Sequence, residues 1–471
     1  MTNVLGRSIA FRSAVLVGSK AIQDLLSSLL FIWLARSNQT GYGLIMFGLS
    51  VAMLLRSIQS MGLDQYTLRE LTAGRCSERL LLARMARLKL LLSFAVIAVF
   101  LLIAFIKEWE SVQILLVLIL LLGQITEGLA DTYFNMLRAL GRSVNEGVCR
   151  TGPNLMAALY GIVVLATHMD IMFFAGYFLI GGGGKLIFAL SVVGRLSGSR
   201  GSSPKTDSAV NAKPLLLFVL ISFMGMFYNE VQVFWLKHLQ TLETIAHYRV
   251  AVDLTSFACG AFATQVAGGV LFPLFVSLYQ KKDRDEFTAV VHMHFKRLVV
   301  IGLGIVLFLL LYGDDLLLLV YGSNYLPSTR AIPYVAIAVL FSFINNFIVF
   351  ALLAMHREKR LCLYLLLPVG LSILVSPGLI TTWGASGAAV SLLVCRVGLS
   401  VILLFVMQSQ LHLFSWARYR GLIWSIGWAV LLFGLVYPLD STAAGTAAFL
   451  VYLATIRQEG TGRADLAKSG N

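Results

Sequence analysis

Ten ionisable side chains fall inside long apolar runs of this chain, five of them basic and five acidic. They are Lys20, Asp24, Arg56, Glu127, Asp131, Lys185, Glu230, Arg249, Asp253 and Arg396. A charged group at the centre of a bilayer costs about 2.5 to 3.5 kcal/mol on insertion scales, so such groups usually face a polar interior and serve a function. Guanidinium groups bind anions such as phosphate through their planar fork. The sequence therefore predicts charged groups that line an interior passage.

Two of these cations have a carboxylate at helical spacing. Lys20 and Asp24 are four residues apart, as are Arg249 and Asp253, so each pair shares a helix face and is able to neutralise itself locally. The other three cations have no opposite charge within a turn of their own helices, namely Arg56, Lys185 and Arg396. Each of the three needs a partner on another helix or an anionic ligand.

Glu127 and Asp131 are also four residues apart and share a helix face. Two like charges one turn apart repel each other, which favours protonation of one carboxyl and predicts a proton-binding site. The pattern does not choose among a proton, sodium and the membrane potential as the driving force. We predict no cofactor and no metal site, and H+ or Na+ coupling stays open.

The elements that must position these groups are transmembrane helices. The chain has 471 residues, of which 58% are hydrophobic and 13% charged, and its mean hydropathy is +0.83. Apolar runs of about 20 residues, each long enough to cross a hydrocarbon core, recur from end to end. The predicted fold class is all-α, a polytopic integral membrane protein with 12 to 14 transmembrane helices. The five cysteines lack the spacing of a disulfide framework or a zinc site.

Hydropathy in a window of about 19 residues places the individual spans. They are 14–34, 42–63, 90–106, 112–136, 147–167, 171–194, 214–236, 245–279, 288–312, 328–355, 361–382, 386–407, 421–437 and 441–456. With both termini in the cytoplasm, the basic residues gather in cytoplasmic segments, as the positive-inside rule requires. The first such segment, 64–89, holds Arg69, Arg75, Arg79, Arg84, Arg87 and Lys89. Topology and anionic lipid heads therefore explain the net charge of +14, and no nucleic-acid partner is expected.

The spans divide into two groups of six around a polar, Gly- and Ser-rich stretch that predicts a flexible cytoplasmic linker. The predicted parts are an N-lobe of residues 1–194, the linker 195–213, a C-lobe of residues 214–410, an additional helical hairpin 411–456 and a cytoplasmic tail 457–471. Weak similarity between FIWLARSNQTGYG and VFWLKHLQTLETIAHYR aligns Trp33 with Trp235. This similarity predicts two pseudo-symmetric lobes related by an axis along the membrane normal.

Two glycine-containing stretches call for an explanation. GGGGK, residues 181–185, lacks the Ser or Thr that a phosphate-binding loop requires after the lysine, because Leu186 stands there. Its glycines instead predict close helix packing or a helix bend. WGASGAAVSLLVCR, residues 383–396, predicts a turn at Trp383 and Gly384, followed by a face of small residues that directs Arg396 inward.

Several stretches together resemble the Wzx-like polysaccharide flippases of the MOP superfamily. They are WLARSNQTGYG, MGLDQYTLRELTAG, AHYRVAVDL with LFPLFVSLYQKKDRDEF, YGSNYLPSTRAIPYVAIAVL and GASGAAVSLLVCR. The resemblance covers most of the chain and implies the two-lobe MOP flippase fold. It also implies movement of a polyprenyl-(pyro)phosphate-linked oligosaccharide from the cytoplasmic to the outer leaflet of a bacterial inner membrane, by alternating access, for O-antigen or exopolysaccharide assembly. Members of this family often carry an acidic residue near the position of Arg396, so coupling residues do not transfer simply.

This resemblance gives the interior cations a task, which is to shelter the phosphate of the glycolipid as it crosses the hydrocarbon. The predicted substrate contacts are Arg56, Arg249, Arg396, Lys20 and Lys185. The predicted groups for ion coupling or charge pairing are Asp24, Glu127, Asp131, Glu230 and Asp253. In the alternative interpretation, the cations only pair with these carboxylates and hold helices together. Asn345, in the middle of a span, is likewise expected to bond a neighbouring helix in preference to a sugar.

Other functions remain open within and outside this fold. A MATE-type cation or drug exporter shares the fold but is expected to have a net acidic cavity, and a lipid II flippase is a third possibility. A membrane glycan polymerase or ligase generally needs a sizeable outer loop, whereas the longest one predicted here, near 313–327, has only about 15 residues. We therefore expect a transporter and not an enzyme. Its expected partners are the glycolipid, membrane lipids and a glycan polymerase or other assembly proteins.

Overall fold

The computed structural model describes a chain built of helices. The described residues are 23–60, 63, 64, 67, 71, 78–139, 142–197, 212–264, 271–280 and 284–411. Among them every regular element is a helix and no strand occurs, which confirms the all-α prediction. Lys20, most of the linker 195–213 and everything beyond Leu411 lie outside these residues, so the predictions made for them stay predictions.

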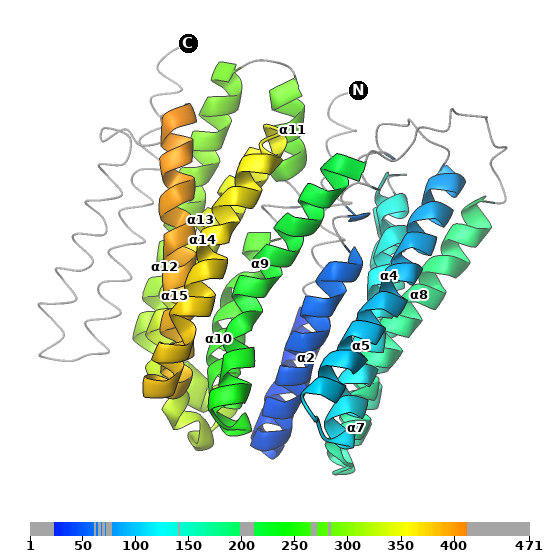
Figure 1. Cartoon of the computed structure of the whole chain (residues 1–471), viewed down its shortest axis with the longest axis vertical. Coiled ribbons are helices and arrows are strands. Elements are labelled where there is room, and N and C mark those ends of the chain that lie inside the picture. The colour runs from blue at the N-terminus through cyan, green and yellow to red at the C-terminus, as the bar shows by residue number, and fades with distance from the viewer. Residues whose placement is uncertain are drawn as a thin grey trace, which may run out of the picture. The chain divides into compact units, whose positions relative to one another are not determined.

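Residues 23–37 are helical and precede the labelled helices of Figure 1. These are α2 (Gln39–Ser60), α4 (Glu78–Ile106), α5 (Ser111–Ala139), α6 (Ser143–Ala166), α7 (Ile171–Phe174), α8 (Gly176–Ser197), α9 (Ala212–Leu239), α10 (Leu242–Thr264), α11 (Phe272–Gln280), α12 (Arg284–Tyr321), the 3-10 helix η2 (Ser323–Ala331), α13 (Ile332–Ala354), α14 (Glu358–Leu374) and α15 (Ser376–Leu411).

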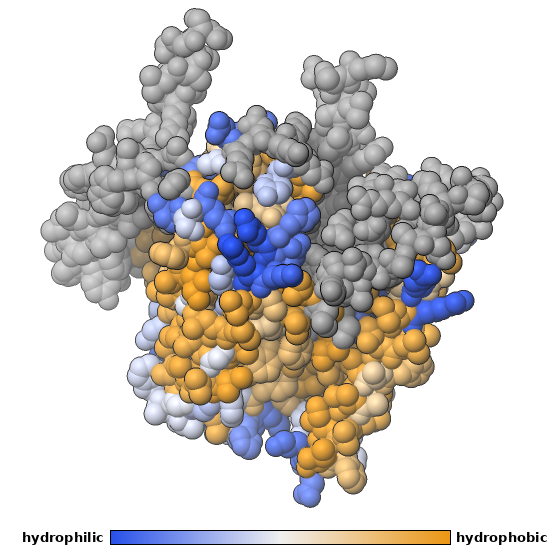
Figure 2. Space-filling view, turned by 45° about the horizontal axis from the view of Figure 1, so that its top comes forward, coloured by the Kyte–Doolittle hydropathy of each residue, from blue (hydrophilic) through white to orange (hydrophobic). Residues whose placement is uncertain are grey.

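Many of these helices are long and apolar enough to cross a membrane. The described part of the chain contains nine such segments: Gln39–Ser60, Leu80–Ile106, Ser111–Leu137, Val144–Ala166, Ile171–Arg195, Val219–Leu239, Asp285–Tyr321, Ser323–Ala354 and Ser376–Leu411. Hydrophobic side chains cover most of the coloured surface in Figure 2, as expected where side chains face acyl chains instead of water. The protein is therefore a multi-pass membrane protein.

The chain separates into two compact units. Unit 1 comprises residues 1–249 and 372–384, and unit 2 comprises residues 250–371 and 385–471. The three divisions fall inside helices, after Arg249 in α10, after Leu371 in α14 and after Gly384 in α15. The Gly384 backbone departs from helical geometry, with φ 54° and ψ −124°, so α15 breaks at the predicted turn. The predicted lobes 1–194 and 214–410 stay a prediction.

Helix α5 is the central element of unit 1, packing against α2, α4, α6 and α8. Figure 1 shows α5 beside α8, and glycines bring the two backbones together. A Cβ at Gly182 of α8 would lie 2.1 Å from the carbonyl oxygen of Gly123 in α5, and one at Gly123 would lie 2.7 Å from the carbonyl oxygen of Phe178. Close helix packing at the GGGGK stretch is thereby confirmed.

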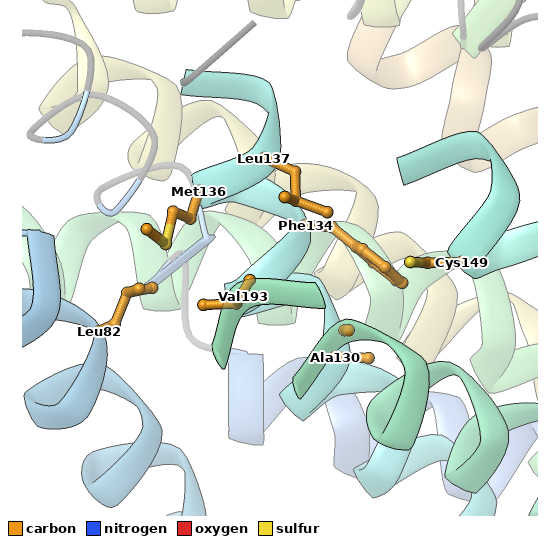
Figure 3. Close-up of a cluster of buried hydrophobic side chains, with 8 residues drawn as sticks. Leu82, Ala130, Phe134, Met136, Leu137, Cys149 and Val193 are labelled. Atoms are coloured by element: carbon orange, nitrogen blue, oxygen red, sulfur yellow. The ribbon is translucent and has the colours of Figure 1, made fainter. Parts of the chain in front are cut away.

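A buried apolar cluster fixes one part of unit 1. Its members come from α4, α5, α6 and α8, and are Leu82, Ala130, Phe134, Met136, Leu137, Cys149, Ala189 and Val193. Figure 3 shows the Phe134 ring extending toward Cys149 of α6. Arg150 follows Cys149 on the same turn of α6. The cluster therefore also positions the helix turn that carries Arg150, whose ion pairs are described below.

In unit 2, α12 packs along α13, and η2 packs on both helices. An apolar cluster of Leu309, Ala336, Val339 and Phe343 joins α12 to α13. Asn345 of α13 donates from Nδ2 to the Arg396 carbonyl of α15 at 3.0 Å and accepts a 2.6 Å hydrogen bond from Ser400 Oγ. The expectation that Asn345 bonds a neighbouring helix is confirmed.

Several predicted boundaries were wrong. Helix α4 begins at Glu78 and not at residue 90, because charged residues on its first turns do not interrupt the helix. The described parts of the span predicted at 245–279 belong to α10 and α11, and because residues 265–270 lie outside the described residues, this span stays a prediction. The outer loop predicted near 313–327 is helical, since α12 continues to Tyr321 and η2 follows it.

Helix α6 is closely followed by a residue with a left-handed backbone, His168. His168 follows the last turn with φ +52°, and the Met169 and His168 amides donate to the Val164 and Leu165 carbonyls at 3.2 and 3.3 Å. This left-handed residue after a helix favours glycine. We expect His168→Gly to stabilise the purified protein by about 1 kcal/mol in thermal unfolding, since side chains are strained there. Thr167→Gly is the control; its φ of −89° predicts no gain, and an equal gain would contradict the argument.

Candidate functional site

Six charged side chains of unit 1 form one connected cluster, here called the charge network. It joins four helices and consists of Arg56 from α2, Glu127 and Asp131 from α5, Glu146 and Arg150 from α6, and Lys185 from α8. Three of its members are cations and three are carboxylates. The structure therefore brings together four of the ten charged residues predicted from the sequence and adds Glu146 and Arg150.

Arg56 binds both carboxylates of α5. Its Nη2 lies 2.7 Å from Asp131 Oδ2, and its Nη1 lies 3.3 Å from Glu127 Oε2 and 2.7 Å from Gln124 Oε1. The side chain of Arg56 keeps 23% of its surface exposed, as does that of Glu127. Arg56 has no opposite charge within a turn of α2, and its ion-pair partners lie on another helix, as the sequence predicted.

Each carboxylate of α5 also has a second cation. Lys185 Nζ lies 2.7 Å from Glu127 Oε1, and Arg150 Nη2 lies 2.8 Å from Asp131 Oδ1. The repulsion expected between Glu127 and Asp131 is therefore offset by three positive charges. The geometry differs in this respect from the predicted proton-binding pair.

Arg150 is fixed on its other sides as well. Its Nε donates to Glu146 Oε1 at 2.9 Å, one turn away on α6, and its guanidinium lies 4.2 Å from the centre of the Phe134 ring. An arginine over an aromatic face gains a cation–π attraction. Arg150 is thereby held between α5 and α6 independently of Arg56.

The glycines of α5 and α8 position the Glu127–Lys185 pair. Gly123 and Glu127 are four residues apart on α5, and Gly182 and Lys185 are three apart on α8, so each glycine shares a helix face with a charged residue. Because the glycines let the backbones touch, the lysine reaches the carboxylate across a short gap. The GGGGK stretch therefore orients a lysine within the bundle.

A second polar group lies between α4 and α5. The Lys89 side chain is fully buried and donates from Nζ to Asp64 Oδ1 and to the Gly128 carbonyl, both at 2.7 Å. Asn135 Nδ2 donates to the same Asp64 oxygen at 3.1 Å. Burial raises the pKa of the Asp64 carboxyl, and the Lys89 ammonium acts in the opposite direction. Lys89, predicted for the cytoplasmic segment 64–89, lies in the apolar segment Leu80–Ile106, and the side of the membrane on which it lies stays a prediction.

A third group joins α2, α9 and α10 within unit 1. Arg249 Nη2 donates to Glu230 of α9 and to Ser50 of α2. The side chains of Arg249 and Glu230 are only 12% and 10% exposed, so this is a buried ion pair. Arg249 thus has a carboxylate partner on another helix, and its predicted local pairing with Asp253 stays a prediction.

The ion pairs described in unit 1 are balanced in charge. Their cations are Arg56, Lys89, Arg150, Lys185 and Arg249, and their anions are Asp64, Glu127, Asp131, Glu146 and Glu230. The sequence predicted cationic substrate contacts, with pairing to carboxylates as the alternative, and each of these five cations stands beside a carboxylate. Burial explains the pairing, because an uncompensated charge among apolar helices is costly.

Three other predicted residues are not among the six that define the charge network. Asp24 is half-buried in the helical residues 23–37 of unit 1, while Asp253 in α10 and Arg396 in α15 are half-buried in unit 2. Their predicted roles stay predictions. Arg150 and Glu146 were missed because they lie at the start of the predicted span 147–167 and just before it. Their spacing of four residues was the available signal, since it places them on one helix face.

The amino-acid sequence matches no protein-family model and no curated protein. Solved structures do match. The lipid II flippase MurJ, in an inward closed conformation, gives a TM-score of 0.68 at 13% identity, covering 94% of this chain and 99% of that one. A MATE protein in complex with MaD3S gives 0.62 at 13% identity, covering 86% and 96%. An inward-facing multidrug resistance MATE family transporter of the MOP superfamily gives 0.58 at 13% identity, covering 83% and 94%.

The chain has the MOP transporter fold. The predicted fold class is thereby confirmed, and at 13% identity the likeness defines the fold alone. Helices α2, α5, α6 and α8, which carry the charge network, are thus part of a MOP-fold membrane protein. What such a network does in this chain has to be argued from its own residues.

Proposed function

We propose that this protein is a flippase that moves a polyprenyl-(pyro)phosphate-linked oligosaccharide from the cytoplasmic to the outer leaflet of a bacterial inner membrane. The observation that carries the proposal is the likeness to a lipid II flippase over 94% of the chain. The two MATE structures match 86% and 83% of it. Together with the resemblance to Wzx-like flippases, this favours a lipid-linked substrate for surface polysaccharide assembly and alternating access as the mechanism.

The exposure of the charge network supports a polar passage. Arg56 and Glu127 each keep 23% of their side-chain surface exposed although their helices are apolar enough to cross a membrane. Charged groups that face acyl chains are costly, so the exposed part of this cluster is expected to face water. A glycolipid carries its phosphate and sugar hydroxyls through such a water-filled region while its lipid tail stays in the bilayer.

The phosphate requires cations along this route. Arg56 is the best placed of the described candidates, because it is partly exposed and its fork binds phosphate oxygens bidentately. Lys185 and Arg249 are more buried beside carboxylates, and Arg396 belongs to unit 2. We assign Arg56 the first phosphate contact, and the contact predicted for Arg396 stays a prediction.

A MATE-type exporter of cationic drugs is the second candidate. The carboxylates Glu127 and Asp131 favour it, because they would attract a cation if their own partners moved away. The solved MATE structures favour it by fold. The positive charge of Arg56 would attract the anionic phosphate of a glycolipid, whereas it would repel a cationic drug. The two candidate functions therefore predict opposite effects of removing this charge.

Reconstituted translocation distinguishes the candidates. Proteoliposomes that contain a fluorescent polyprenyl-diphosphate oligosaccharide should flip it, whereas they should not accumulate a cationic dye. Arg56→Gln is expected to slow flipping about tenfold or more, as for the loss of charge-assisted hydrogen bonds. Arg87→Gln is the matched control, because Arg87 is an exposed arginine of α4. Dye transport without glycolipid flipping would replace this proposal by the exporter.

A further inference from the structure

The three cations of the charge network are not equivalent. Arg56 contacts both Glu127 and Asp131, whereas Lys185 contacts only the first of these and Arg150 only the second. Arg56 is also the most exposed of the three, at 23%, against 17% for Arg150 and 8% for Lys185. The arrangement thus places one shared, accessible cation between two dedicated, less accessible ones.

This arrangement decides what happens when Arg56 moves. If Arg56 leaves, Glu127 keeps Lys185 at 2.7 Å and Asp131 keeps Arg150 at 2.8 Å, so neither carboxylate loses its last cation. Gln124, the third partner of Arg56, is neutral and loses only a hydrogen bond. Breaking a buried ion pair is strongly destabilising chiefly because it leaves the other charge unpaired. That penalty is small for Arg56.

The dedicated cations are held by contacts that do not involve Arg56. Arg150 stays in place through Glu146 and the Phe134 ring, and Lys185 through the glycine-mediated approach of α8 to α5. By contrast, the carboxylate of Glu230 has Arg249 as its one ion-pair partner in the described chain. We call Lys185 and Arg150 standby partners, because each stays paired with a carboxylate when Arg56 leaves. The charge network has such partners, whereas the described Arg249–Glu230 pair does not.

We infer that Arg150 and Lys185 are positioning residues that keep Asp131 and Glu127 paired while Arg56 is released from the network. Arg56 is then free to change partners at little cost in stability. The release of Arg56 toward a passing anion rests on the proposed function, whereas the standby pairing itself does not. Arg150 and Lys185 need not touch the substrate.

A thermodynamic cycle tests the pairing without a transport assay. Purified Arg56→Gln, Arg150→Gln and the double variant are compared by thermal unfolding in one detergent. Arg56→Gln alone is expected to change Tm little. Arg150→Gln carries a loss of its own, because it also takes a cation from the buried Glu146 carboxylate. The double variant should lose clearly more than the sum of the single losses, because both ion pairs described for Asp131 are then gone. Additive losses would overturn the inference.

A third substitution separates charge pairing from packing. Adding Asp131→Asn to the double variant is expected to restore the part of the Tm loss that exceeds the sum of the single losses. The unpaired Asp131 carboxylate is then removed, while the loss at Glu146 and the two missing side chains remain. If the double variant does not accumulate, recovery of a foldable protein in the triple variant is the readout. A triple variant as unstable as the double one would contradict the standby role.

The conservative variant supplies the matched control. Arg56→Gln combined with Arg150→Lys keeps a cation beside Asp131. The Tm loss of this double variant should therefore equal the sum of the Tm losses of its two single variants. Flipping by Arg56→Gln is measured separately. Normal flipping together with a non-additive cycle would retain the standby pairing and remove Arg56 from the proposed phosphate contact, so the two ideas fail independently.

Discussion

Gly182→Leu is expected to abolish accumulation of the protein in the membrane. A Cβ at this position would lie 2.1 Å from the Gly123 carbonyl oxygen and 2.6 Å from Thr126 Oγ1. The first of these atoms belongs to the backbone of α5 and is unable to rotate aside, so the two helices would have to separate. Separation would also pull Lys185 away from Glu127. The measurement is the amount of folded protein in membrane fractions and its monodispersity after detergent extraction.

Gly183→Ala is the matched control on the same helix. Nothing lies within 4 Å of a Cβ at Gly183, and alanine favours a helix more than glycine does by about 1 kcal/mol. We expect this variant to accumulate at least as well as the unchanged protein. Normal accumulation of Gly182→Leu would show that α5 and α8 do not approach as closely as the structure has them.

Arg249→Gln is expected to destabilise the protein by about 3 to 5 kcal/mol, because it removes the one ion-pair partner that the buried Glu230 carboxylate has among the described residues. The substitution also removes the hydrogen bond to Ser50 and with it a link between α2 and α10. The measurement is thermal unfolding of the purified protein, with yield from membranes as a second readout. This response should far exceed that of Arg56→Gln, whose carboxylates keep other partners.

The paired substitution shows whether the unpaired charge is the cause. Arg249→Gln with Glu230→Gln removes both charges and is expected to recover most of the stability, since two neutral amides are able to bond each other. An Arg249→Gln protein as stable as the unchanged one would contradict the buried ion pair. If the paired variant is no better than Arg249→Gln, the contacts of the arginine itself are what matters.

These expectations divide the buried charges of unit 1 into two kinds. The Arg249–Glu230 pair has one cation for one carboxylate and acts as a fixed connection among α2, α9 and α10. The charge network has a shared cation and is able to lose it. In a transporter, the fixed kind maintains a bundle during motion, whereas the exchangeable kind allows a ligand to compete for one member.

Much of the fold could be predicted from local patterns. Apolar runs predicted the helices for two reasons. A segment that crosses a bilayer must form its backbone hydrogen bonds within itself, and its side chains must suit either the lipid or the helix bundle. Both requirements produce a hydrophobic stretch that is visible in a short window of the sequence. The close packing at residues 181–184 and the break at Gly384 followed from glycine, whose missing Cβ has a local consequence wherever it occurs. Helix ends were less certain, as α4 shows, because charged residues near an interface are tolerated within a helix.

The partners of the charged groups were decided by the tertiary structure alone. The sequence singled out Arg56, Glu127, Asp131 and Lys185 as costly in a membrane, but their contacts span up to 75 residues and depend on which helix faces meet. Arg150 and Lys89 were hidden because hydropathy placed them at the edge of spans. Burial cost is a property of one residue and is readable in sequence, whereas pairing depends on the relative rotation of helices, which only packing determines.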